Sequence, residues 1–160
     1  MKQIICLAAL SFIPTLVLAQ AKPGEAATIK GVEIKGDAKP GATVTAVVKV
    51  ELAKSYHAHS NKPSESSYIP TVIAVNVPKG VKAGSIKYPA GKSLKVEVID
   101  KPLSIYEDEF EVSVPLTLGR DAALPLTIPA TLSYQACKGA VCYPPKKVKF
   151  DIVVGAAKRP

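Results

Sequence analysis

The feature that most constrains this chain is a regular alternation of apolar and polar residues. Every second residue is apolar or aromatic in segments 44–52, 110–118, 124–134 and 148–154. Successive side chains of a β-strand point to opposite faces, so the alternation predicts strands with one buried and one solvated face. No segment shows a convincing helical period, which favours an all-β chain.

Shorter strands are also expected, separated by turn residues at short intervals. Pairs such as Pro40-Gly41 and Ala90-Gly91 mark the turns, and fourteen prolines indicate many edge or bulged strands. About seven or eight short antiparallel strands predict one β-sandwich domain of the immunoglobulin-like type. The additional strand candidates are Thr28–Lys35, Thr71–Val77, Ser85–Tyr88 and Leu94–Ile99.

The first residues, 1–21, have the organisation of a secretory signal peptide. Lys2 is followed by the apolar run Ile4–Leu18 and by the small-residue cleavage motif Ala19-Gln20-Ala21. The alternative is an uncleaved membrane anchor, but the run is shorter than the ~20 residues that a span needs and contains Pro14. We therefore expect an exported protein in an oxidising compartment.

Removal of this segment, and of Cys6 with it, leaves a domain at residues 22–155 and a tail at residues 156–160 that is expected to fray. The formal net charge of the whole chain is +8. Its lysines are scattered over predicted strands and loops, without the interleaved aromatics or basic helix of a nucleic-acid binder. The charge therefore indicates solubility and steering of partners, and no nucleic-acid partner is expected.

Two cysteines remain after this removal, Cys137 and Cys142, with four residues between them. They flank the tight connection 138–141 between two predicted strands, where cross-strand neighbours lie close enough for a disulfide. In the chain-entropy model, so small a loop contributes about 2 kcal/mol, against ~4.7 kcal/mol for a loop of a hundred residues. Redox exchange and an inert hairpin disulfide both remain open, and lysines such as Lys138 and Lys146 would favour a reactive thiolate.

Sequence motifs around the cysteines and elsewhere resemble one family. The motif "YQACKGAVCYPP" at 134–145, with "YIPT" at 68–71, "YP" at 88–89 and "IYED" at 105–108, resembles the N-terminal periplasmic domain of the thiol:disulfide interchange protein DsbD. The resemblance covers residues 44–154, nearly the whole domain. It implies an immunoglobulin-like periplasmic domain that needs no cofactor and works as a protein-disulfide-reductase-type electron relay.

The resemblance also implies partners and residue roles. Electrons would come from a membrane-embedded thiol reductant of the DsbD or CcdA type on another polypeptide, and pass to periplasmic thioredoxin-fold proteins. Cys142 would form the mixed disulfide with the partner, and Cys137 would resolve it. The best-known members place one residue more between the cysteines and shield them with a phenylalanine. This chain has none at the corresponding positions 98–103, so Ile99 or Leu103 is expected to shield the pair, with Tyr134 and Tyr143 flanking it.

Two histidines offer a different interpretation of the same cysteines. His57 and His59 are two residues apart, so on an extended segment both would point the same way. They begin the irregular polar region 56–69, which is long enough to be a functional loop. If this loop folds over the cysteine hairpin, His57, His59, Cys137 and Cys142 could form a copper or zinc site. A structural sandwich with an inert disulfide is the third alternative.

Overall fold

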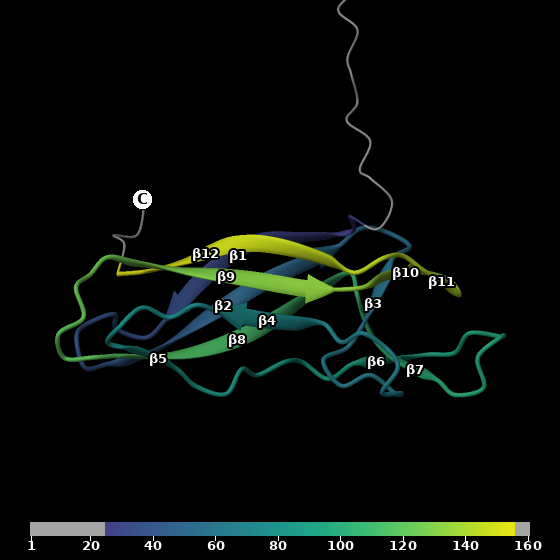
Figure 1. Cartoon of the computed structure of the whole chain (residues 1–160), viewed down its shortest axis with the longest axis horizontal. Coiled ribbons are helices and arrows are strands. Elements are labelled where there is room, and N and C mark those ends of the chain that lie inside the picture. The colour runs from purple at the N-terminus through teal and green to yellow at the C-terminus, as the bar shows by residue number, and fades with distance from the viewer. Residues whose placement is uncertain (1–24, 156–160) are drawn as a thin grey trace, which may run out of the picture.

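The computed structural model describes residues 25–155, which fold into an antiparallel β-sandwich (Figure 1). One layer is a four-stranded sheet in the order β1–β2–β8–β5, formed by β1 (Ala27–Lys35), β2 (Thr43–Leu52), β8 (Glu109–Leu118) and β5 (Val81–Ala83). The facing layer is a three-stranded sheet in the order β12–β9–β4, formed by β12 (Lys146–Val154), β9 (Leu126–Tyr134) and β4 (Val72–Val75).

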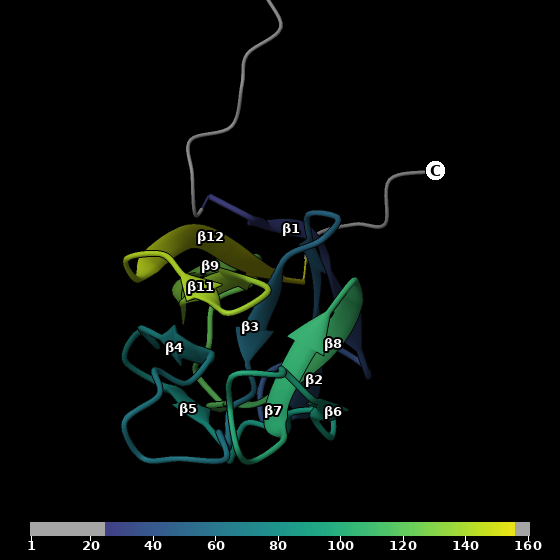
Figure 2. The ribbon, with the colours of Figure 1, turned by 90° about the vertical axis from the view of Figure 1, so that its right-hand side faces the viewer.

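A third sheet of five short strands closes one end of the sandwich, seen end-on in Figure 2. Its order is β11–β10–β3–β7–β6, formed by β11 (Val141–Cys142), β10 (Ala136–Lys138), β3 (His57–His59), β7 (Leu103–Glu107) and β6 (Lys92–Leu94). All strand pairs in the three sheets are antiparallel. The predicted all-β, immunoglobulin-like sandwich is therefore confirmed.

Two predictions concern residues that the structure does not describe. The signal peptide at 1–21 and the tail at 156–160 lie outside the described residues, and the domain predicted from residue 22 is described from residue 25 onward. Between residues 25 and 155 the chain forms no helix that is long and apolar enough to cross a membrane.

The core lies between the two large sheets, where the alternating series meet. Strands β2 and β8 pair over their length from Thr43↔Thr117 to Glu51↔Glu109, and β9 pairs with β12 from Leu126↔Val154 to Tyr134↔Lys146. These registers place the apolar series of each strand on the inner face, as predicted. The buried side chains include Val44, Val48, Val50, Val112, Val114, Leu116, Leu118, Ile128, Leu132, Ile152 and Val154.

Two predicted strands differ from the structure. Ser85–Tyr88 is a loop held by a single bridge between Lys87 and Ser113. Leu94–Ile99 contributes only Leu94 to a strand, although its sequence alternates. Strand β6 ends there because the next partner on β7 would be Pro102, which has no N–H to donate to the ladder.

The five-stranded sheet is built from continuations of the long sandwich strands. β7 leads into β8 through Asp108, whose φ of 54° produces a sharp bend, and β9 leads into β10 through Gln135. β3 follows β2, and β11 precedes β12, after short connections. Strands from both layers therefore converge at this end, and the core holds the small sheet in place.

Tyr134, at the end of β9, ties the first strand to this end of the core. Its side chain is buried, and its hydroxyl accepts hydrogen bonds from the backbone N–H groups of Ala26 and Ala27, both at 3.1 Å. The residue next to a predicted site thus also anchors the start of β1 across the sandwich.

We expect Tyr134→Phe to destabilise the fold, because the variant leaves backbone donors at the start of β1 without their acceptor. The expected loss is about 1–3 kcal/mol in the free energy of unfolding, measured by urea denaturation. Tyr143→Phe is the matched control; it removes a hydroxyl that hydrogen-bonds the Tyr56 side chain near solvent, where water can replace it, so a smaller loss than that of Tyr134→Phe is expected. Equal losses in the two variants would contradict the anchoring role.

Candidate functional site

The two cysteines face each other across the tightest turn of the five-stranded sheet. β10 and β11 pair through Cys137↔Cys142 and Lys138↔Val141, leaving a two-residue turn at Gly139 and Ala140. Gly139 has a φ of +57°, and a type II′ hairpin turn requires such a positive φ at its first central position. A disulfide joins the pair, with the Cα atoms 3.9 Å apart.

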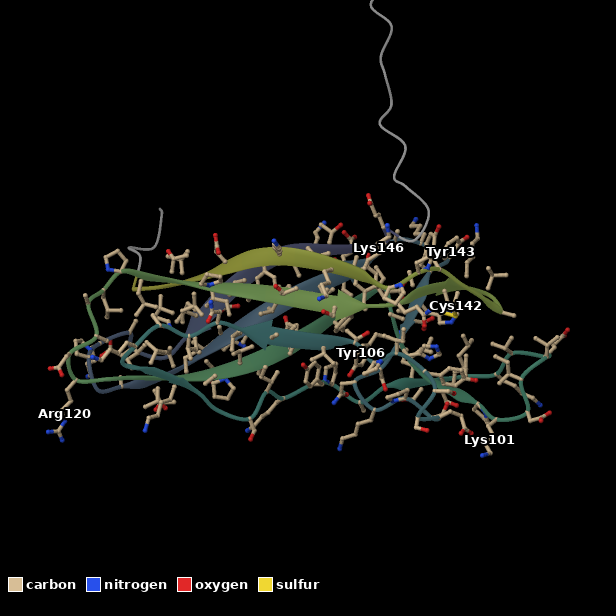
Figure 3. The ribbon with its side chains drawn as sticks, viewed as in Figure 1. Lys101, Tyr106, Arg120, Cys142, Tyr143 and Lys146 are labelled. Atoms are coloured by element: carbon tan, nitrogen blue, oxygen red, sulfur yellow. A yellow bond between two sulfur atoms is a disulfide. The ribbon has the colours of Figure 1, made fainter. Side chains whose placement is uncertain are left out.

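The two sulfur-bearing residues differ in their exposure. Cys137 is completely buried, because β10 is paired on both sides, with β11 and with β3. Cys142 is exposed on the edge strand β11, beside Val141 and the partly exposed Tyr143 (Figure 3). A second protein approaching this edge therefore meets Cys142 first.

The two faces of the five-stranded sheet carry different side chains. Ala136, Ala58 and Tyr106 lie side by side on β10, β3 and β7, and they face the sandwich core. Cys137, His57 and Glu107 form the neighbouring row, which points to the other face because successive side chains alternate.

His57 and His59 thus lie on a strand, not in the irregular loop that the sequence predicted. Both are on the same face as Cys137, and their exposed fractions are only 5% and 1%. The sequence missed this strand because β3 is only three residues long and its partners, β7 and β10, are distant in sequence. The i, i+2 spacing nevertheless indicated correctly that the two side chains share a face.

Both imidazoles are buried without hydrogen-bond partners for most of their nitrogens. Nε2 of His57 and both ring nitrogens of His59 have none. Burial lowers the pKa of both histidines, and His57 lowers that of His59 further, whereas Glu107 opposes the shift at His57. The neutral imidazole is therefore the favoured form of each.

His59 is the histidine that the fold brings to the cysteines. A ring nitrogen of His59 and the two sulfur atoms of Cys137 and Cys142 lie within 4.8 Å of one another. His57 does not belong to this group, although it is the backbone neighbour of Cys137. The loop after β3 covers the ring of His59, since Tyr68 stacks on it at 4.4 Å between centroids and 6° between planes.

The two predicted flanking tyrosines occupy different environments. Tyr134 points into the core, as described above, whereas Tyr143 lies beside Cys142 and its ring contacts Tyr56 at 5.8 Å between centroids. A hydrogen bond with Tyr56 raises the pKa of Tyr143. The backbone N–H of Tyr143 also donates to the Ala136 carbonyl at 2.9 Å, which fixes the chain just after Cys142.

The β6–β7 hairpin approaches the cysteine turn from the opposite side of a cleft of about 350 Å³. Leu94 and Val96 line this cleft together with Gly139 and Tyr56. No sequence motif had marked either aliphatic residue as part of the site. Leu103 is buried on β7, and Ile99 is half-buried in a separate hollow that Tyr68 also lines. Shielding of the disulfide by Ile99 or Leu103 stays a prediction.

The sequence predicted that Lys138 and Lys146 favour a thiolate at the cysteines. In the structure, neither lysine is directed toward the disulfide by its local contacts or strand geometry. Lys138 is exposed and alternates with Cys137 along β10, so it points to the opposite face of the strand. Lys146 forms an ion pair with Glu25 at 3.8 Å. Lys92, on the edge strand β6, pairs with Glu107 at 3.0 Å.

Comparison with known proteins identifies the family. Residues 26–153 match the family model described as "Thiol:disulfide interchange protein DsbD, N-terminal". The chain belongs to this family. No curated protein sequence gives a significant match.

Solved N-terminal domains of ScsB and of DsbD are similar to this chain at low sequence identity. The N-terminal periplasmic domain of ScsB from Proteus mirabilis has a TM-score of 0.56 at 14% identity, over 85% of this chain and 49% of that one. This chain thus spans about half of that structure, and the likeness supports the fold. The reduced N-terminal domain of DsbD from Neisseria meningitidis has a TM-score of 0.48 at 21% identity, over 78% of this chain and 85% of that one. The structure of the complex between the DsbD and PilB N-terminal domains from Neisseria meningitidis has a TM-score of 0.46 at 18% identity, over 80% of this chain and 88% of that one.

We expect acidification to destabilise the metal-free protein through its two buried histidines. Their pKa values lie below the ordinary value of 6.5 in the folded state, so the unfolded chain takes up these protons first as the pH falls. Their contribution to stability is therefore complete above about pH 6.5, and it is lost as the pH falls from there through the folded-state pKa values. Thermal unfolding midpoints across this window, measured in the presence of a chelator, test the expectation.

A His57→Gln variant serves as the control for other titrating groups. It should lose part of the pH dependence and keep the remainder, which belongs to His59 and to the carboxylates. Variants at both histidines that are as pH-sensitive as the parent protein would contradict the assignment.

Proposed function

We propose that this domain relays electrons by thiol–disulfide exchange through Cys137 and Cys142. The observation that carries the proposal is the unequal burial of a bonded pair at a sheet edge: one cysteine is exposed and the other is completely buried. Exchange requires attack on one particular sulfur followed by resolution from the other. Membership of the DsbD N-terminal family supports the same chemistry.

The proposed exchange takes place in two steps. In the dithiol form, the Cys142 thiolate attacks a sulfur of the partner's disulfide, and the partner's second sulfur leaves as a thiolate. The Cys137 thiolate then attacks Sγ of Cys142, which breaks the intermolecular bond and releases the partner as a dithiol. Two electrons and two protons pass to the partner, and the Cys137–Cys142 disulfide of the structure is the product.

Reduction of this disulfide returns the domain to its starting state. The incoming thiolate would attack Cys142, because its sulfur lies on the exposed edge strand, and Cys137 would leave into the buried row beside His57. We infer that the reductant is a membrane-embedded thiol protein and that the acceptors are thioredoxin-fold proteins. A periplasmic location is part of the proposal, supported by the signal-peptide pattern in residues 1–21 and by the periplasmic ScsB domain of similar fold.

A purely structural role for the disulfide fits the fold less well. The bond closes a loop between residues only five positions apart, which contributes about 2 kcal/mol in the chain-entropy model. The two large sheets already form a continuous apolar core without it, and the turn is defined by backbone pairing and Gly139. Stabilisation therefore does not explain why the pair is present.

The roles of the two cysteines predict which single variant is trapped by a partner. Cys137→Ala, reduced and mixed with a purified, oxidised thioredoxin-fold protein, should accumulate a mixed disulfide through Cys142, because nothing resolves it. Non-reducing electrophoresis and mass spectrometry detect the adduct. Cys142→Ala is the matched control and should accumulate much less, since its remaining thiol is buried. Equal trapping by both variants would reverse or abolish the assigned roles.

The reduction potential of the pair separates exchange from an inert staple. We expect a value more oxidising than about −300 mV, the level below which structural disulfides typically lie. Equilibration with glutathione buffers in metal-free solution, followed by alkylation of free thiols, measures it. If glutathione buffers do not reduce the disulfide at all, the bond has a structural role and the proposed exchange is wrong.

A further inference from the structure

Two buried imidazoles beside the cysteines are not explained by thiol exchange. His59 is 1% exposed, and neither of its ring nitrogens has a hydrogen-bond partner in the structure. Leaving a buried polar group without a partner destabilises the folded state. The general rule is that such groups are satisfied, so an exception next to two sulfur atoms points to a ligand.

The position of His59 is fixed by contacts that leave its nitrogens free. Strand β3 pairs with β7 and β10 on its two sides, and the Thr71 hydroxyl donates to the His59 carbonyl at 2.6 Å. Tyr68 covers a face of the ring in a nearly parallel stack. Because the ring nitrogens lie in the ring plane, the stack orients the imidazole without occupying them. One of these nitrogens lies within 4.8 Å of both cysteine sulfurs.

We propose that His59, Cys137 and Cys142 bind a single Cu(I) ion when the cysteines are in the dithiol state. Thiolate sulfur is a soft ligand that selects Cu(I), and imidazole nitrogen is a common copper ligand. Reduction breaks the S–S bond, so the two sulfurs can separate enough to hold an ion between themselves and the imidazole.

The three converging ligands suit Cu(I) and do not complete the four-ligand tetrahedron of a structural zinc site. A zinc ion held by two cysteines and one histidine would need a water as its fourth ligand. In the part of the chain that the structure describes, the potential metal ligands that converge at the disulfide are His59, Cys137 and Cys142. The buried side of the site is formed by Cys137 and His59, and the exposed Cys142 leaves an entry for the ion.

Copper binding and electron relay would exclude each other, because both use the same sulfur lone pairs. The bound ion would hold the domain in its dithiol state and prevent Cys142 from attacking a partner. The inference goes beyond the relay and requires from it only that the dithiol state exists, which a chemical reductant also supplies. Failure to bind copper would leave the exchange mechanism intact.

The test is a competition titration of the reduced chain without residues 1–21, and so without Cys6, under anaerobic conditions. Cu(I) is supplied as its complex with a chromophoric bidentate chelator, and transfer to the protein is followed by the loss of chelator absorbance. We expect uptake of one ion per chain, with thiolate-to-copper absorption in the ultraviolet and protection of both cysteines from alkylation. No transfer, or transfer that leaves the cysteines open to alkylation, overturns the proposal.

A pair of variants of similar size separates ligation by His59 from its role in packing. His59→Leu removes the ligand, whereas His59→Met places a soft thioether in nearly the same volume, so their effects on folding should be similar. The His59→Leu variant should bind Cu(I) at least about tenfold more weakly than the parent protein, which is the size of effect seen when residues around a metal are replaced. The His59→Met variant should recover much of the lost affinity. Equal affinities in the two variants would show that the thiolates alone hold the ion.

His57 provides the control on the same strand. It is also buried and also has an unpartnered nitrogen, but it lies outside the group that includes both sulfurs. His57→Gln should therefore keep the affinity of the parent protein. A loss as large as that of His59→Leu would overturn the assignment of His59 as the specific ligand.

Discussion

The chemistry of this domain depends on one pairing constraint, the position of β10 between two other strands. Cys137 has Cys142 beside it on one side and His57 on the other. The residue before it, Ala136, is packed in the sandwich core. A cysteine held in this way cannot move far when the disulfide opens, which leaves Cys142 as the attacking residue in the proposed exchange. Rigid support from strands is what keeps a reactive group in a productive geometry.

The same sheet explains how a small sandwich carries polar chemistry in a buried place. Its inner face continues the apolar core, while its outer face holds the cysteine and histidine row under the loop that contains Tyr68. Strands from both layers of the sandwich end here, so the site is supported from two sides. The β6–β7 hairpin across the cleft adds Leu94 and Val96 near the turn.

Electron relay and metal binding are related through the oxidation state of the sulfurs. As a disulfide the pair has no thiolate to offer an ion, whereas in the two proposals the dithiol would either attack a partner or bind Cu(I). His59 adds a ligand that is close to both sulfurs but has no place in the exchange steps. If both proposals hold, the domain would respond to the availability of a thiophilic ion as well as to the redox state of its partners.

The sequence by itself determined the long strands and the cysteine hairpin, because these depend on local patterns. Alternation assigned the inner faces of β2, β8, β9 and β12, and the spacing around Gly139 located the turn. Only the tertiary structure decided that His57 and His59 lie on a buried strand and that His59 alone reaches both sulfurs. Strands of two to five residues are too short for a periodic signal, and their positions are set by partners distant in the chain.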